Sequence, residues 1–99
     1  ERAGKVDAIL VIGGTGLSSR DKSIEALSPL FSKRIPGFGE LFRYETYKSK
    51  GYMAWLTRAD AGLIGSTLVF ITPGSPNAVE TAAKIILSEL GHAVYVAKS

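Results

Sequence analysis

The sequence predicts an α/β fold in which helices cover a largely parallel sheet, and three observations lead to this prediction. Residues 8–12 and 67–71 are apolar on both faces and rich in β-branched side chains, as is typical of parallel strands buried between helices. Each run ends in a glycine-containing turn, at residues 13–16 and 73–74. Each turn is followed by a helical pattern, which is the order of α/β units. Ligands of open parallel sheets bind beyond the carboxyl ends of the strands, so we expect both turns to face one site.

Two helices are predicted between the first turn and the middle of the chain. Ser23 or Asp21 can cap the first helix, and Glu25 lies in its first turn, where the helix dipole favours an acid. Pro29 interrupts the apolar face of this helix and predicts a kink or a fresh start. The Pro-Gly pair that follows predicts a turn, and a second helical pattern then covers residues 38–47.

The second half of the chain contains two further helical patterns. Apolar spacing predicts a short helix over residues 53–63, closed by a glycine. After the second strand, Ser75 is placed to cap a helix, and Pro76 occupies its first position, where the missing N–H costs nothing. The apolar stripe of this helix continues to Gly91, a plausible stop. For residues 92–99 the sequence allows either a helix or a short extended tail.

Composition bounds the class of protein. Ninety-nine residues with 45% hydrophobic content suit one globular domain. The net charge of +3 is mild and the basic residues are scattered, so small anionic ligands are favoured over nucleic acid. The chain has no cysteine, which excludes disulfides, thiolate metal sites and a cysteine nucleophile. No apolar run reaches the length of a membrane span. We expect a cytoplasmic protein with neither nucleic acid nor membrane as a partner.

The turn at residues 13–16, Gly-Gly-Thr-Gly, is the main candidate for a binding site. Glycine permits positive φ and lets a ligand approach the backbone closely. Residues 14–19 match a dinucleotide fingerprint except at Ser19, and the chain has no Gly-Lys pair followed by Ser or Thr, as a Walker loop requires. The remaining interpretation is an anion nest of backbone N–H groups assisted by the hydroxyls of Thr15, Ser18 and Ser19. The alternative is a strand-to-helix turn that binds nothing.

Arg20 and Asp21 follow this turn and supply chemistry that a turn alone does not require. Arg20 can clamp a phosphate or form a surface ion pair of little energetic value. Asp21 can cap a helix, the commoner role of such a residue, or hold Mg²⁺ that bridges phosphate oxygens, and both roles can coexist. We therefore predict that the loop holds a phosphorylated ligand, with Mg²⁺ as the cofactor.

Other candidate residues are open to more than one interpretation. Tyr44, Tyr47, Tyr52 and Trp55 can form a stacking wall for a flat ring, but such residues more often belong to a core or an interface. His92 is the sole histidine and lies far along the final helix or tail, which favours a surface role over catalysis. No Ser-His-Asp arrangement or histidine-based metal set can be assembled.

The chain contains four ordered motifs, which are Gly-Gly-Thr-Gly (13–16) with Arg20-Asp21, Pro-Gly-Phe-Gly-Glu (36–40), Leu-Thr-Arg-Ala-Asp-Ala-Gly (56–62) and Pro-Gly-Ser-Pro-Asn (73–77). Together they resemble the motifs of the MoaB/Mog family, the molybdopterin-binding domains of molybdenum-cofactor biosynthesis. The resemblance extends over essentially the whole chain and is nearest to MoaB proteins. It implies a three-layer α/β/α fold with a mainly parallel sheet and a homo-oligomer, either a trimer or a hexamer. It also implies Mg²⁺-dependent adenylylation of molybdopterin by ATP with release of pyrophosphate.

The resemblance also assigns roles to individual residues. Asp21 would be the catalytic carboxylate near Mg²⁺, and Arg20 would help to neutralise charge. The glycine loop would cradle nucleotide phosphate and ribose, while Thr46, Thr57 and Ser75 would lie at the pterin. The substrate-binding set implied in this way is Gly13, Gly14, Thr15, Gly16, Ser18, Thr46, Thr57, Arg58, Gly74 and Ser75.

Two departures from the family pattern change the expected activity. Residues 22–25, Lys-Ser-Ile-Glu, lack the proline of the Thr-Pro-Glu run found in relatives. Family domains also begin with a strand, a helix and a loop bearing a second functional aspartate, which residues 1–99 do not contain. We therefore expect the chain to correspond to the carboxy-terminal two-thirds of such a domain, with weak or no adenylyltransferase activity by itself. The alternatives are a non-catalytic molybdopterin-binding or scaffold module and a generic nucleotide-binding fragment.

Overall fold

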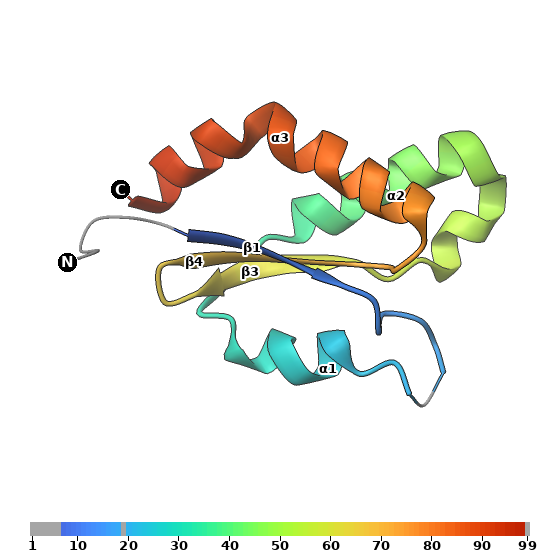
Figure 1. The fold of residues 1–99 in the computed structure, drawn as a ribbon, viewed down its shortest axis with the longest axis horizontal. Coiled ribbons are helices and arrows are strands. Elements are labelled where there is room, and N and C mark those ends of the chain that lie inside the picture. The colour runs from blue at the N-terminus through green and yellow to red at the C-terminus, as the bar shows by residue number, and fades with distance from the viewer. Residues whose placement is uncertain (1–6, 19, 99) are drawn as a thin grey trace.

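The computed structural model describes residues 7–18 and 20–98, which form a four-stranded sheet between two layers of helices (Figure 1). Helix α1 lies on one face of the sheet, and α2 and α3 lie on the other. This arrangement confirms the predicted three-layer α/β/α class. The elements in chain order are β1 (Asp7–Ile12), α1 (Ser23–Leu27), the 3₁₀ helix η1 (Ser28–Leu30), β2 (Lys33–Arg34), α2 (Pro36–Lys50), the 3₁₀ helix η2 (Gly51–Leu56), β3 (Asp60–Ile64), β4 (Thr67–Thr72) and α3 (Pro76–Lys98).

Strand β4 is one of the two inner strands of this sheet, with β1 on one side and β3 on the other, in the order β1-β4-β3-β2. Strands β1 and β4 are parallel and in register from the Asp7–Thr67 pair to the Ile12–Thr72 pair. Both strands extend the predicted runs by one residue at one end. Because the two strands are parallel, their carboxyl ends meet at one edge of the sheet.

The helix predicted over residues 53–63 is wrong. The chain forms η2 up to Leu56 and then strand β3. A tight turn, in which Gly65 has a φ of +62°, returns β3 antiparallel onto β4. The apolar positions of this stretch fit helical spacing, but the turn at Gly65 favours a hairpin. Among the described strands one pairing is parallel and two are antiparallel, which corrects the expected mainly parallel sheet for these residues.

The helical boundaries also differ from the predictions at several points. Pro29 does interrupt the first helix, which ends at Leu27 and continues as η1. The turn predicted at the Pro-Gly pair is wrong, because Pro36 occupies the first position of α2, where proline is tolerated. Helix α2 ends before Gly51, whose φ is +68°. Helix α3 does not stop at Gly91 but continues to Lys98, since an interior glycine costs only about 1 kcal/mol relative to alanine.

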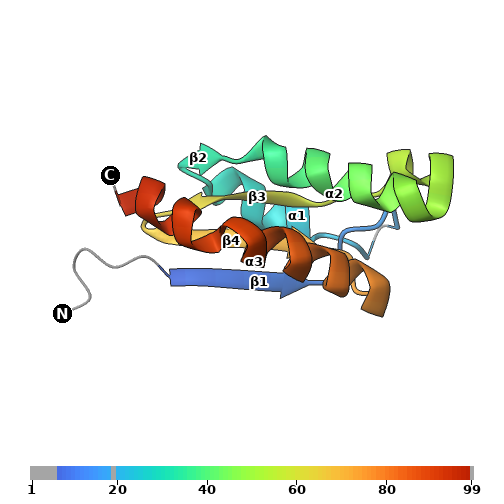
Figure 2. The same cartoon turned by 90° about the horizontal axis from the view of Figure 1, so that it is seen from above.

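The hydrophobic core lies between the sheet and the layer formed by α2 and α3, which run side by side (Figure 2). Phe38 of α2 contacts Phe70 of β4 edge-on, with ring centroids 5.2 Å apart. Gly39 lets α2 approach the sheet, because a Cβ there would lie 2.7 Å from the Ala59 carbonyl oxygen. None of the helices in the described part of the chain is long and apolar enough to cross a membrane. The buried cluster consists of Phe38, Phe42, Ala59, Ala61, Leu68, Phe70 and Ala82.

Candidate functional site

The turns that follow β1 and β4 are adjacent at the carboxyl edge of the sheet. The Gly13 amide donates a hydrogen bond to the Thr72 carbonyl oxygen, at 2.8 Å. A Cβ placed on Gly74 would lie 3.5 Å from the Cα of Gly13. The two turns therefore lie side by side, as expected, and a common ligand site between them stays a prediction.

The glycine loop has the backbone conformation that its sequence requires. Gly13 and Gly14 have φ values of +98° and +71°, which residues with a side chain rarely adopt. A Cβ on Gly14 would also collide with the hydroxyl of Ser23. That hydroxyl donates a hydrogen bond to the Gly13 carbonyl oxygen at 2.7 Å, and the Ser23 amide donates to the Gly14 carbonyl oxygen at 2.9 Å. The start of α1 thus fixes the loop, and Ser23 holds the loop rather than capping the helix.

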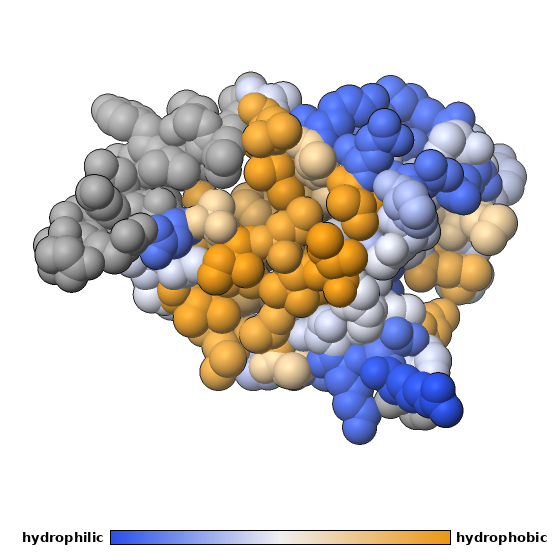
Figure 3. All heavy atoms as spheres, in the orientation of Figure 1, coloured by the Kyte–Doolittle hydropathy of each residue, from blue (hydrophilic) through white to orange (hydrophobic). Residues whose placement is uncertain are grey.

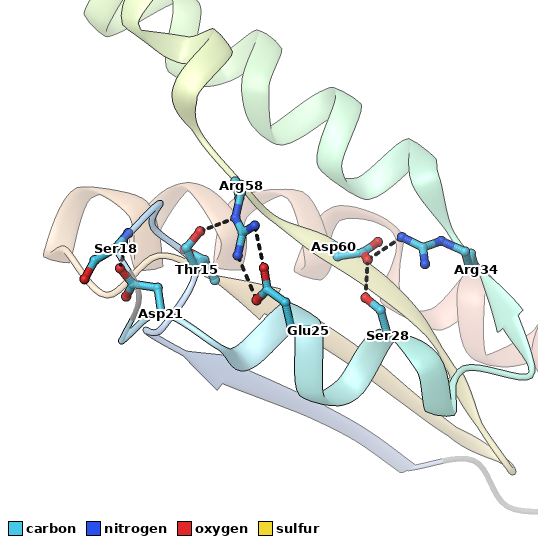
Figure 4. A network of polar contacts seen from close by, with 8 residues as sticks. All are labelled: Thr15, Ser18, Asp21, Glu25, Ser28, Arg34, Arg58 and Asp60. Carbon is cyan, nitrogen blue, oxygen red and sulfur yellow. Dashed lines mark hydrogen bonds and ion pairs between the residues drawn. The ribbon is translucent and has the colours of Figure 1, made fainter.

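Arg58 joins the glycine loop to α1. Its Nε donates a hydrogen bond to the Thr15 carbonyl oxygen at 2.6 Å, and its two Nη atoms donate to the Glu25 carboxylate at 2.7 and 3.0 Å (Figure 4). The hydrogen bonds from Arg58 lower the pKa of Glu25. The same contacts with Glu25 raise the pKa of Arg58, and the charge of Asp21 adds to this effect. A bidentate guanidinium pair of this kind fixes orientation as well as charge.

Asp21 folds back onto the glycine loop. Its Oδ2 accepts a hydrogen bond from the Ser18 amide at 3.2 Å, and a Cβ on Gly16 would lie 2.8 Å from the same oxygen. The residue that precedes α1 is Lys22, and no side chain caps this helix. The helix-capping interpretation of Asp21 is therefore wrong, and its carboxylate lies at the loop instead.

Two neighbouring cavities open at this edge of the sheet. The first, here named the loop cavity, has a volume of about 290 Å³ and is lined by Gly14, Thr15, Gly16, Asp21, Leu56, Thr57, Arg58, Pro73 and Gly74. The second, here named the helix cavity, has a volume of about 220 Å³ and is lined by Phe42, Thr46, Ser49, Lys50, Thr57, Pro73, Ser75, Asn77, Ala78 and Thr81. Thr57 and Pro73 line both cavities and so separate two adjoining compartments.

Most of the residues predicted from the sequence line these cavities, but Gly13, Ser18 and Arg20 do not. Ser18 and Arg20 are exposed and line neither cavity, although the Ser18 hydroxyl accepts a hydrogen bond from the Arg20 amide at 3.2 Å. Ser19 lies outside the described residues. Gly13 supports the loop through its contacts with Thr72 and Gly74. The residues brought together as predicted are Gly14, Thr15, Gly16, Asp21, Thr57, Arg58 and Gly74 in the loop cavity, and Thr46, Thr57 and Ser75 in the helix cavity.

A protein-only metal centre is absent from the part of the chain that the structure describes, because no three acidic or histidine side chains cluster there. Asp21 is the one acidic residue that lines the loop cavity. Mg²⁺ is commonly held by one or two carboxylates together with phosphate oxygens of the substrate. A magnesium ion that arrives with a phosphorylated ligand would find one protein carboxylate in the loop cavity, that of Asp21.

The fold and the cavities define an α/β domain with a candidate ligand site at the carboxyl ends of its parallel strands. Residues 1–92 match the family described as a probable molybdopterin binding domain, and the chain belongs to this family.

The curated relatives carry the name molybdenum cofactor biosynthesis protein B. The Bacillus subtilis protein is 52% identical over 92 residues, which are 91% of this chain and 54% of that protein. The Staphylococcus carnosus protein is 51% identical, with the same shares covered. The chain thus spans about half the length of the curated relatives that it matches.

Solved structures of related proteins have the same fold. The tungsten cofactor synthesizing protein MoaB from Pyrococcus furiosus superposes with a TM-score of 0.90 at 44% identity, over 94% of this chain and 60% of that one. The molybdopterin biosynthesis Mog protein from Mycobacterium ulcerans superposes with a TM-score of 0.83 at 30% identity, over 92% of this chain and 59% of that one. These structures confirm the expected MoaB/Mog-like architecture.

Proposed function

We propose that the protein acts in molybdenum-cofactor biosynthesis by binding molybdopterin and ATP at adjoining positions. The observation that carries this proposal is the pair of cavities that share Thr57 and Pro73. The loop cavity has the glycine turn, Asp21 and Arg58, which suit phosphate groups. The helix cavity has the hydroxyls of Thr46 and Ser75, which can hydrogen-bond a polar heterocycle.

The reaction supported best is adenylylation of molybdopterin by the full-length protein. An oxygen of the terminal pterin phosphate forms a bond to the α-phosphorus of ATP, and the bond from that phosphorus to the bridging β-oxygen breaks, with its electron pair going to pyrophosphate. Such transfers depend mainly on positioning and electrostatics. The loop amides would orient the phosphate, and Asp21 would hold Mg²⁺. When bound, that ion neutralises charge on the phosphate oxygens.

A second candidate is a molybdopterin-binding module without catalysis. It is favoured by the single carboxylate of the loop cavity, because Glu25 is already engaged by Arg58. Substrates would still bind in this case, but the transfer step would lack a second metal-site acid. The two candidates therefore differ in turnover rather than in binding.

Calorimetric titration with molybdopterin and, separately, with ATP and Mg²⁺ tests the proposal. We expect both to bind and Asp21→Asn to weaken the binding of ATP with Mg²⁺ at least about tenfold, since a metal carboxylate is lost. The matched control is Glu80→Gln, which changes an exposed side chain of α3 and should alter the affinity for neither ligand. Binding of both ligands without turnover would favour the module, and failure of molybdopterin to bind would refute both candidates.

The quaternary structure and location implied by the family resemblance are parts of the same proposal. A trimer or hexamer is expected, and sedimentation of the protein is the direct test. The cytoplasmic location stays a prediction from composition.

A further inference from the structure

A third cavity adjoins the loop cavity and shares two of its lining residues. Its volume is about 410 Å³, and Thr57 and Arg58 line both it and the loop cavity. Basic side chains reach it from three elements or their flanks: β2, α2 and the stretch before β3. We name it the arginine cavity, and its lining residues are Ile24, Arg34, Pro36, Gly39, Arg43, Trp55, Thr57, Arg58, Ala59 and Asp60.

Two of its three arginines are neutralised by acids. Arg58 is paired with Glu25, as described above. Arg34 donates to Oδ2 of Asp60 at 2.7 Å, and this oxygen also accepts from the Ser28 hydroxyl at 2.8 Å (Figure 4). The other oxygen of Asp60 accepts from the Ala61 amide at 2.9 Å. Both oxygens of Asp60 therefore have partners, and its charge is already balanced by Arg34.

Arg43 is the third arginine of the cavity, and no acidic partner for it is found among the described residues. Its side chain is half-buried. Its guanidinium lies over Gly39, since a Cβ there would be 3.2 and 3.4 Å from its two terminal nitrogens. A partly desolvated guanidinium without an acid partner, at the wall of a cavity, favours an anionic ligand with two oxygens to accept its hydrogen bonds.

We propose that the arginine cavity receives the β- and γ-phosphates of the nucleotide and then the pyrophosphate released from it. This inference rests on the proposed adenylylation. In phosphoryl-type transfers the attacking and leaving oxygens lie roughly in line on opposite sides of phosphorus. The helix cavity shares Pro73 with the loop cavity, the arginine cavity shares Arg58 with it, and Thr57 lines all three. The acceptor phosphate would enter from the helix cavity and the diphosphate would leave into the arginine cavity.

The charge balance of the transfer gives Arg43 its role. When the bond between the α-phosphorus and the bridging oxygen breaks, the electron pair stays on the leaving pyrophosphate. Arg43 would hold this developing charge, while Arg58 spans the boundary between the two cavities. Positive groups placed where charge develops stabilise the transition state.

Trp55 provides a direct readout of this cavity. It is the only tryptophan of the chain and lines the arginine cavity, with 77% of its surface exposed. We suggest titrating the protein with inorganic pyrophosphate alone, monitored by tryptophan fluorescence and by calorimetry. Arg43→Gln should weaken binding about tenfold or more, since charge-assisted hydrogen bonds are lost. Arg43→Lys keeps the charge but not the planar fork, so its binding should be intermediate.

The matched control is Lys84→Gln, which removes one positive charge from an exposed position on α3. Its pyrophosphate affinity should equal that of the unmodified protein, and circular dichroism should show that each variant is folded. Equal losses in Arg43→Gln and Lys84→Gln would indicate a general charge effect and overturn the proposal, as would pyrophosphate binding that Arg43→Gln leaves unchanged. Pyrophosphate binding through Arg43 without molybdopterin binding would refute the proposed adenylylation alone. Molybdopterin binding without pyrophosphate binding would refute the arginine-cavity assignment alone.

Discussion

Strands β1 and β4 have nearly the same composition but very different surroundings. Each has six residues, and they pair in parallel along their whole length. In β4, between β1 and β3, Leu68 and Ile71 are 1% and 0% exposed. In β1, at the edge of the described sheet, Ile9 and Ile12 are 51% and 53% exposed. An apolar run thus predicts a strand suited to burial, while burial itself depends on the neighbours that the strand has.

The exposed side of β1 is part of a continuous apolar surface. Apolar side chains gather over this part of the molecule in Figure 3. Leu87 of α3 is 71% exposed and lines a cavity of about 220 Å³ together with Ile9 and Leu10. Surfaces of this kind usually mark an interaction.

The carboxyl end of β1, in contrast, is firmly held. Gly13 bonds to Thr72, and Arg58 bonds to Thr15 in the loop that follows β1. The strand therefore combines an open edge with a fixed end, and the fixed end is the one at the candidate site.

Truncation of one apolar side chain in each strand is the strongest test of this contrast. Leu68→Ala should reduce the free energy of unfolding by about 2–5 kcal/mol, because it leaves a cavity in the core. Ile9→Ala should cost only about 1 kcal/mol or less, in the usual range of exposed positions. Urea denaturation followed by circular dichroism measures both values. Losses of similar size would show that another surface covers β1 in solution.

Strand β3, which pairs with β4 on the side away from β1, should tolerate added side-chain volume poorly. A Cβ on Gly62 of β3 would lie 2.5 Å from the Phe31 ring and 2.7 Å from the Lys33 carbonyl oxygen. Gly62→Ala should therefore destabilise the protein by about 1–3 kcal/mol through overpacking. Gly37→Ala in α2 is the matched control, because a Cβ there meets nothing within 4 Å. It should leave stability unchanged or raise it by up to about 1 kcal/mol. A harmless Gly62→Ala would mean that β2 and η1 do not pack closely on β3.

The parts of the fold that could be predicted are those with long, uniform patterns. Strands β1 and β4 and the start of α3 follow directly from apolar runs and from Pro76. Strand β3 was missed because its five residues include Asp60 and Gly62 and continue a spacing that also fits a helix. Its identity is decided by pairing with β4, a tertiary effect that outweighs local propensity.

The candidate site was predictable where one local segment builds it. The glycine loop can be recognised from its own sequence, since the positive φ values at Gly13 and Gly14 require glycine. The Arg58–Glu25 pair could not be recognised, because its members are 33 residues apart and nothing in their spacing links them. The position of Thr57 on all three cavities likewise depends on how the loops converge.

The smallest expected effect concerns the fixed end of β1. Arg58 lowers the pKa of Glu25 chiefly through hydrogen bonds, so Arg58→Gln should raise that pKa back toward its ordinary value. A carboxyl-detected NMR titration measures this change, and Arg34→Gln, whose partner is Asp60, is the control that should not alter it.

Because the pKa of Glu25 in the folded protein lies below its value in the unfolded chain, the contribution of the Arg58–Glu25 pair to stability is present above the unfolded pKa. It is lost as the pH falls through the folded pKa. The loss should be slight, since half of the Glu25 side chain is exposed. If Arg58 holds the loop, the amide signals of Thr15 and Gly16 should shift in the same titration. Amide signals that stay unchanged would indicate that the Gly13–Thr72 hydrogen bond, and not Arg58, fixes the end of β1.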